Sequence, residues 1–156
     1  MPNINEVSGF ENFCPHFSNI NERITLRGTF MGSGSANNKV VDISDYVCSP
    51  DINRTGSVSC MFMNSKYESI ILPNDSLQFS NCGNFSNMFD SCSNLIYLNN
   101  NFHAESMIDC SYMFNNCSSL KKIDVLSYVI SKNSNLSYMF NGCSNLEGIS
   151  CKFDTN

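Results

Sequence analysis

Residues 136–150 read LSYMFNGCSNLEGIS, and the beginning of this stretch recurs three times earlier in the chain. Each copy has the form x-Ser-x-Met-Phe, and its methionines stand 27, 25 and 26 residues apart, at Met61, Met88, Met113 and Met139. The last three copies continue into Cys-Ser-x-Leu, at 92–95, 117–120 and 143–146. A long pattern that returns at a nearly constant period identifies a repeat protein.

The pattern inside one unit predicts its local structure. Ile123-Asp124-Val125 alternates apolar and polar residues, which is the period of a short strand with one buried face. The Ser-x-Met-Phe-x-x-Cys-x-x-Leu stretch places apolar residues three or four apart, which predicts a short helix or 3-10 turn. One unit cannot bury its apolar face alone, but stacked units share a core. We therefore predict an α/β repeat: a solenoid with short parallel strands and short helices or 3-10 turns between them.

The unit from Leu136 to Thr155 resembles the bacterial-surface (BspA-like) type of leucine-rich repeat. That repeat is built on Ser-Tyr-Met-Phe-x-x-Cys-x-x-Leu and ends in Phe-Asp-Thr. The resemblance covers residues 58–156 and, more weakly, 36–57. It implies a curved, leucine-rich-repeat-like solenoid whose short strands line a concave face that binds proteins, without catalytic residues and without a cofactor.

The chain of 156 residues is expected to form a single solenoid domain. Residues 58–156 hold the four x-Ser-x-Met-Phe repeats, and residues 36–57 are interpreted as a degenerate first repeat. Residues 1–35 are interpreted as an irregular N-terminal cap, because terminal repeats must cover the end of the core and are therefore atypical.

Composition excludes several classes of protein. The net charge is −5 and the isoelectric point is near 4.8, which argues against direct binding of nucleic acid through phosphate contacts. No apolar run is long enough to span a membrane. The 24 Asn and 25 Ser make the chain polar, yet its hydrophobic content of 42%, with 12 Phe and 8 Met, is enough for a core.

The N-terminal sequence has neither a basic region nor an apolar region of the kind that opens a secretory signal, so a cytoplasmic location is expected. In that compartment the nine cysteines are expected to be thiols. No Cys-x-x-Cys pair is present, so no metal site is predicted. Cysteine is small and often buried, and we therefore predict that Cys92, Cys117 and Cys143 line the core.

The chain lacks the motifs of common enzymes. It contains no Gly-x-Gly-x-x-Gly, no P-loop and no Gly-x-Ser-x-Gly, and its two histidines stand in unrelated contexts. We therefore predict no catalytic residue, no cofactor and no enzymatic activity.

A binding surface is predicted on the strands. If Ile70, Leu98, Ile123 and Ile149 point inward, the residues on either side of each point outward. The candidate partner-binding residues are Asp42, Ser69, Ile71, Tyr97, Asn99, Lys122, Asp124 and Ser150. Ile71 and Tyr97 are the apolar members of this set, and aromatic anchors often contribute most of the binding energy.

Two functions agree with these patterns. The first is an intracellular inhibitor, immunity protein or adaptor that covers a partner protein. A basic nucleic-acid-processing protein would suit the acidic charge, as for inhibitors of the anti-CRISPR type. The second is an adhesion-type surface or secreted leucine-rich-repeat protein.

The last unit leads to a further expectation. An uncovered strand edge and apolar ladder at its end would bind a second copy or the target. Leu146, Ile149, Cys151 and Phe153 are expected to line such a homodimer contact.

Overall fold

The computed structural model describes residues 24–25, 27–43, 55–72, 82–98, 103–124 and 127–150, with side chains in 27–43, 57–72, 82–98, 107–123 and 133–149. Most of the expected cap, at 1–23, lies outside the described residues. The described strands are β1 (Ile24–Thr25), β2 (Val40–Asp42), β3 (Thr55–Ser57), β4 (Ser69–Ile71), β5 (Tyr97–Leu98), β6 (His103–Asp109), β7 (Lys122–Asp124), β8 (Ser127–Asn135) and β9 (Gly148–Ser150).

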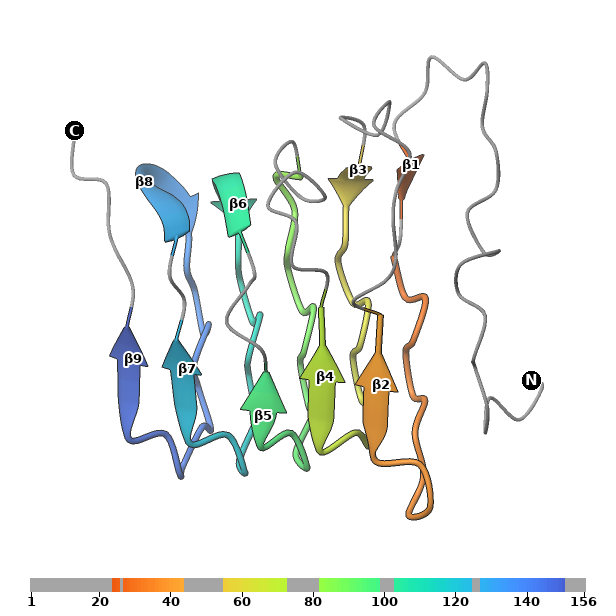
Figure 1. Ribbon diagram of the computed structural model, residues 1–156. Coiled ribbons are helices and arrows are strands. Elements are labelled where there is room, and N and C mark those ends of the chain that lie inside the picture. The colour runs from red at the N-terminus through yellow and green to blue at the C-terminus, as the bar shows by residue number, and fades with distance from the viewer. Residues whose placement is uncertain are drawn as a thin grey trace.

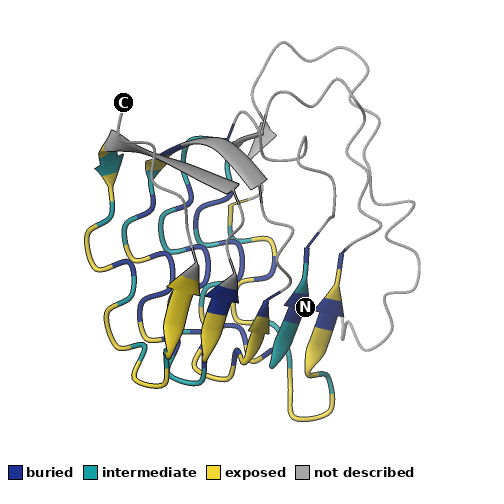
Figure 2. Ribbon diagram, turned by 60° about the vertical axis from the view of Figure 1, so that its left-hand side comes forward, coloured by how far each residue is buried: buried dark blue, intermediate teal, exposed yellow. Residues whose placement is uncertain are grey.

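These strands pair in parallel in small sheets. β2, β4 and β5 form a three-stranded sheet, while β1–β3, β6–β8 and β7–β9 form two-stranded sheets. Figure 1 shows β2, β4, β5, β7 and β9 side by side in one row, with β1, β3, β6 and β8 in a second row. Residues in β2 alternate between exposed and buried, so one side of this strand faces the core (Figure 2).

Between the two rows of strands, successive repeats lie against one another. We call the repeated segments rungs 1 to 5: residues 27–43, 57–72, 84–98, 109–124 and 135–150. From rung 3 to rung 4, the amides of Asn87, Phe89 and Ser91 donate to the carbonyls of Ser111, Met113 and Asn115, over 2.9, 2.9 and 2.8 Å. The same three bonds join each of the other neighbouring rungs. The hydrogen bonds at these positions therefore all point from the earlier rung to the later one.

Rung 1 extends this arrangement beyond the four copies that the sequence pattern reveals. The amides of Gly28, Phe30 and Gly32 donate to carbonyls of rung 2 at the positions that the later rungs use. These residues lie at the end of the expected cap and carry Gly-Thr-Phe where the repeats carry x-Met-Phe.

A column of phenylalanine rings fills the core along the stack. Ring centroids lie 5.1 Å apart between Phe30 and Phe62, 5.5 Å between Phe62 and Phe89, and 5.1 Å between Phe89 and Phe114. Phe140 continues the column at 5.6 Å from Phe114. Neighbouring rings are nearly parallel, and all but Phe140 are buried. The phenylalanine of each repeat thus packs on its equivalents.

The Ser-x-Met-Phe segment forms tight turns. The amide of Met88 donates to the carbonyl of Phe85, and the amide of Cys92 donates to that of Phe89. The third residue of each turn, Asn87 or Ser91, has a positive φ of 56° or 60°. That backbone conformation is typical of a type II turn and is incompatible with a helix. Positive φ recurs at the equivalent positions of the other rungs: Gly28, Gly32, Cys60, Asn64, Tyr112, Asn116, Tyr138 and Gly142.

The predicted fold class is therefore wrong. The described residues contain no helix and no 3-10 turn, because a left-handed residue interrupts the Ser-x-Met-Phe-x-x-Cys stretch every four positions. In place of the one strand-lined concave face of an α/β leucine-rich-repeat-like solenoid, the described strands form four small parallel sheets. The expected strands around Ile70, Leu98 and Ile123 are present, and these three side chains are buried.

The repeated serine has a structural role in the turns. A polar side chain two residues earlier accepts from its amide: Asn84 Oδ1 from Ser86, at 3.0 Å, and Asp109 Oδ1 from Ser111, at 3.0 Å. The serine hydroxyls donate to the same two oxygens over 2.7 and 2.6 Å. Such local bonds favour a turn over a helix at this point.

Next to the phenylalanine column, the stack holds a second column, made of polar side chains. The side-chain amide of Asn141 donates to Asn115 Oδ1 over 2.7 Å, and that of Asn115 donates to Asp90 Oδ1 over 2.9 Å. Asp90 and Asn115 are each only 8% exposed. A buried carboxylate needs hydrogen-bond donors. Asp90 therefore requires an amide donor at position 115, and the Asn115 oxygen in turn receives the amide of Asn141.

The cysteines of the repeat form a third column, as the sequence predicts for the core. Cys92 and Cys117 are fully buried and Cys143 is half-buried; all three are free thiols. Each thiol donates to the phenylalanine carbonyl of the preceding rung: Cys92 to Phe62 at 3.0 Å, Cys117 to Phe89 at 3.1 Å, and Cys143 to Phe114 at 3.0 Å. Ser65 occupies the same position in rung 2.

Candidate functional site

The exposed row of the strands β2, β4, β5, β7 and β9 forms the candidate site, which we call the strand face. Register pairs Val40 with Ser69 and Ser69 with Tyr97, while Lys122 pairs with Gly148. Val40 and Tyr97 are each 52% exposed. The next residue is buried in β2, β4, β5 and β7, as at Ile70 and Leu98, so the pleat holds the exposed row outward there.

The structure describes the side chains of five of the eight sequence-predicted site residues, and these five lie in the exposed row or next to it. Tyr97 and Lys122 are exposed, Ser69 is half-buried, and all three belong to the exposed row. Asp42 is exposed and pairs in register with Ile71, which is half-buried. Asp124 and Ser150 pair across β7 and β9, whereas their side chains and the whole of Asn99 lie outside the described residues.

The structure brings further residues to the strand face that the sequence pattern did not single out. Ile96 precedes β5, and its amide donates to the carbonyl of Glu68 over 2.9 Å. This bond places Ile96 beside Glu68, and 48% of the residue is exposed. Its neighbour Tyr97 is also exposed, so period-two alternation fails at this point and could not reveal Ile96.

Charges of both signs lie beside the apolar residues. Lys39 Nζ contacts Glu68 Oε1 at 2.7 Å, and both side chains are more than a third exposed. Such an exposed pair contributes little to stability, so its charges remain accessible to a ligand. Lys121, Lys122 and Glu147 are exposed in rungs 4 and 5. The strand face therefore carries exposed apolar residues, at Val40 and at Tyr97 with its chain neighbour Ile96, together with charged groups of both signs.

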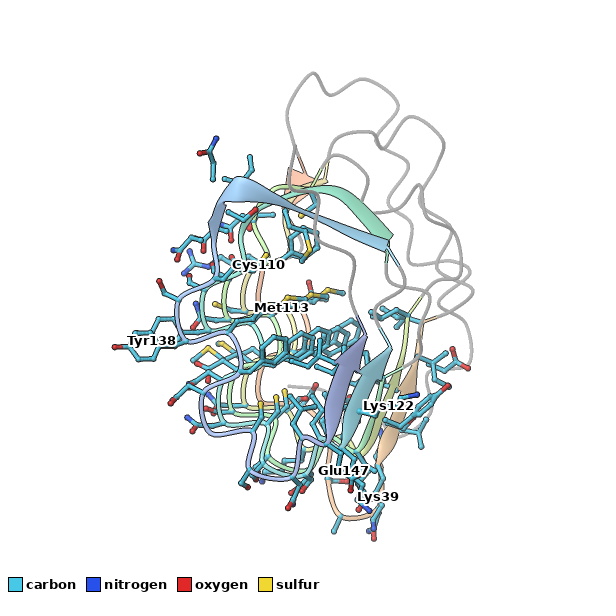
Figure 3. All side chains as sticks on the ribbon, turned by 90° about the vertical axis from the view of Figure 1, so that its left-hand side faces the viewer. Lys39, Cys110, Met113, Lys122, Tyr138 and Glu147 are labelled. Atoms are coloured by element: carbon cyan, nitrogen blue, oxygen red, sulfur yellow. The ribbon has the colours of Figure 1, made fainter. Side chains whose placement is uncertain are left out.

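A second exposed aromatic group lies on the opposite side of the molecule. The rings of Tyr112 and Tyr138 stack with their centroids 4.9 Å apart. Figure 3 shows Tyr138 and Lys122 projecting from opposite sides, with Met113 between them in the interior. These two tyrosines belong to the turns and not to the strand face.

The buried thiols do not form a reactive centre. Burial raises the pKa of the Cys82 and Cys92 thiols to about 11 and that of Cys110 to about 12. Burial likewise raises the pKa of Cys117 and of Cys143. A nucleophilic cysteine needs a lowered pKa, so these thiols are core residues. Among the described residues, no three His, Cys, Asp or Glu side chains are grouped to hold a metal ion.

We expect the buried thiols to resist alkylation in the folded protein. At pH 8, iodoacetamide should label Cys60 and Cys143 well before Cys82, Cys92, Cys110 and Cys117, and urea should remove this difference. Mass spectrometry of tryptic peptides measures the order. Rapid labelling of Cys117 without denaturant would contradict the thiol column.

The same thiols make stability depend on alkaline pH. The folded protein holds their protons to a higher pH than the unfolded chain, whose thiols titrate near the ordinary value of 9.0. Their contribution to stability is therefore complete below pH 9.0 and is lost as the pH rises toward 11. Urea unfolding across this range should show the decline.

The structure adds one finding on membranes: the described residues hold no helix with the length and apolar character that a bilayer span requires.

Comparisons with known proteins place the repeats in a family. No curated protein and no solved structure matches the chain. The family model described as "Mycoplasma protein of unknown function, DUF285" matches residues 56–156, which include the whole of rungs 2, 3, 4 and 5. Because this match covers more than half of the sequence, the chain belongs to the DUF285 family.

Proposed function

We propose that the protein is a non-enzymatic protein-binding module, which covers a partner protein with the strand face in the manner of an inhibitor, immunity protein or adaptor. The observation that carries the proposal is the exposure of Val40 and Tyr97 in one register row, on the two strands that flank β4, with the exposed Ile96 next to Tyr97 in the chain. A single exposed apolar residue is ordinary, but an adjacent aromatic and aliphatic group is typical of an interface centre.

The rigidity of the scaffold supports the proposal. Tyr97 is held by β5, which pairs with β4, and its amide donates to the carbonyl of Glu68 over 3.1 Å. Because the backbone at Tyr97 is already held in place, binding has to order only the side chain. Two rotatable bonds and a large ring make tyrosine a favourable anchor.

The negative net charge of the chain favours a partner protein whose surface is basic. The chain carries a net charge of −5, so it attracts a positively charged protein at long range and repels nucleic acid. A basic nucleic-acid-processing protein has such a surface. The charged groups at the border of the strand face then contribute to orientation and association rate more than to affinity.

The resemblance of the repeat to BspA-like leucine-rich repeats supports a second candidate, an adhesion-type protein that binds an extracellular protein. Protease treatment of intact cells separates the two. The inhibitor or adaptor role requires that the protease leave the protein undigested in intact cells and digest it only after lysis. The adhesion role requires it to be digested on the intact cell.

Substitution tests the strand face directly. Tyr97→Ala should weaken binding of the partner captured from the producing cells by about tenfold or more, because it removes a central aromatic anchor. Tyr138→Gly is the matched control, since it removes an exposed tyrosine from the opposite side at a positive φ that glycine adopts freely. Equal affinities of Tyr97→Ala and wild type, measured by surface plasmon resonance, would refute the proposed site.

A further inference from the structure

The side of rung 5 that faces away from rung 4 is equivalent to the side of rung 4 that rung 5 covers. Phe114, Cys117, Leu120 and Ile123 of rung 4 are at most 2% exposed beneath rung 5. Their equivalents in rung 5 are only partly covered: Phe140, Cys143 and Leu146 are half-buried, and Ile149 is 43% exposed. We call this surface of rung 5 the end face.

The backbone of the end face carries unused donors. In rung 4 the amides of Tyr112, Phe114 and Asn116 donate to rung 5 over 2.9, 2.9 and 2.7 Å. Their equivalents are the amides of Tyr138, Phe140 and Gly142, and these donate no hydrogen bond to any part of the chain that the structure describes. Three donors at alternate residues match the three carbonyls that one further rung would offer.

Side chains of the end face are also left with one side unoccupied. Asn141 donates its amide to Asn115 Oδ1, but no donor in the described residues reaches the Oδ1 of Asn141 itself. The carbonyls of Phe62, Phe89 and Phe114 each accept a thiol from the next rung, whereas no thiol in the described residues donates to that of Phe140. Within the part of the chain that the structure describes, the Tyr138 and Phe140 rings are the last of their two stacks.

We propose that the end face binds a further rung of the x-Ser-x-Met-Phe-Asn-x-Cys pattern, supplied by another polypeptide. The four contacts between rungs within this molecule define what fits. The bound segment offers three carbonyls to the amides of Tyr138, Phe140 and Gly142, and a ring that stacks on Phe140. An asparagine amide reaches Asn141 Oδ1, and a thiol reaches the Phe140 carbonyl. This surface is separate from the strand face and does not depend on its function.

Hydrogen-bond direction favours a rung over a second end face. The amides of Tyr138, Phe140 and Gly142 need three acceptors at alternate residues, and each of rungs 2 to 5 offers three such carbonyls to the rung before it. A second end face brings the same three amides instead. The homodimer contact expected from the sequence, at Leu146, Ile149, Cys151 and Phe153, stays a prediction, because Cys151 and Phe153 lie outside the described residues.

A peptide of this chain provides the probe. Residues 108–124, IDCSYMFNNCSSLKKID, contain the rung 4 pattern and two lysines that favour solubility. A fluorescently labelled form is titrated into the full-length protein under reducing conditions, and anisotropy reports binding. The matched control peptide carries Phe114→Asp, which removes the ring that would stack on Phe140. We expect saturable binding of the first peptide and binding weaker by about tenfold or more for the control.

Protein variants locate the contact. Ile149→Lys, at an exposed position of the end face, should weaken peptide binding by about tenfold, while Tyr97→Ala should leave it unchanged. Hydrogen exchange gives a readout that folding alone does not change: saturating peptide should slow exchange at Tyr138, Phe140 and Gly142 by about tenfold or more. Absence of saturable binding, equal binding of both peptides, or unchanged exchange at these amides would each overturn the proposal.

Discussion

We expect Phe89→Ala to lower the free energy of unfolding by about 3–5 kcal/mol, the range found for large aromatic residues removed from a core. Phe89 is fully buried and stacks on Phe62 on one side and on Phe114 on the other. Its removal leaves a cavity in the middle of the column, and flanking rings that are held by backbone bonds cannot close it. Urea denaturation followed by circular dichroism measures the loss.

Phe140→Ala is the matched control. Phe140 is half-buried, and among the described residues its ring stacks on Phe114 alone. Its loss should cost clearly less than that of Phe89, because less apolar surface leaves the core and no closed cavity forms. If both variants lost the same stability, the phenylalanine column would not be the core of the stack.

The second large effect is expected for Asn115→Asp. The substitution replaces the amide that donates to Asp90 Oδ1 over 2.9 Å with a second buried carboxyl group. At pH 7 the fold must then either bring two carboxylates together or bind a proton between them, which should cost about 2–4 kcal/mol of stability. Lowering the pH toward 4 supplies that proton, so the variant should lose less stability there than at pH 7.

Exchanging the two residues separates this interaction from a general loss of packing. The double variant Asp90→Asn/Asn115→Asp again holds one carboxyl group and one amide in the pair, so it should recover most of the stability at pH 7. Thermal unfolding at both pH values completes the test. A double variant as unstable as Asn115→Asp, or a loss that does not depend on pH, would show that the Asp90–Asn115 bond is not the cause.

The repeat and the strand register follow from the sequence. The spacing of the repeats along the sequence places Ile70, Leu98 and Ile123 at equivalent positions, and all three side chains are buried in the structure. Strand alternation also places Tyr97 and Lys122 outward, because side chains in an extended segment alternate between its two faces.

The turns could not be recognised in the same way. Apolar residues three or four apart are common to a helix and to a chain of tight turns that returns to the core. The decisive signal is a positive φ every four residues, which glycine or asparagine usually reveals. Here tyrosine occupies that position in rungs 4 and 5, and cysteine occupies it in rung 2. These residues reach the left-handed region because the neighbouring rungs hold the backbone in place.

Rung 1 shows a second limit of the pattern. Gly28-Thr29-Phe30 keeps the left-handed position and the ring but lacks methionine, and Ser33 stands where rungs 3 to 5 have cysteine. Only the stacking of Phe30 on Phe62 and the three backbone bonds to rung 2 identify it. The exposed Ile96 was missed for a similar reason, since its position depends on a hydrogen bond and not on alternation.

The most direct test of the account is to map where the partner touches the protein. A photoreactive benzophenone amino acid replaces Tyr97 in one variant and Tyr138 in another, and each is irradiated in the producing cells. The strand-face account predicts one cross-linked protein, identified by mass spectrometry, from position 97, and its absence from position 138. That protein cross-linked from position 138 and not from position 97 would contradict the account.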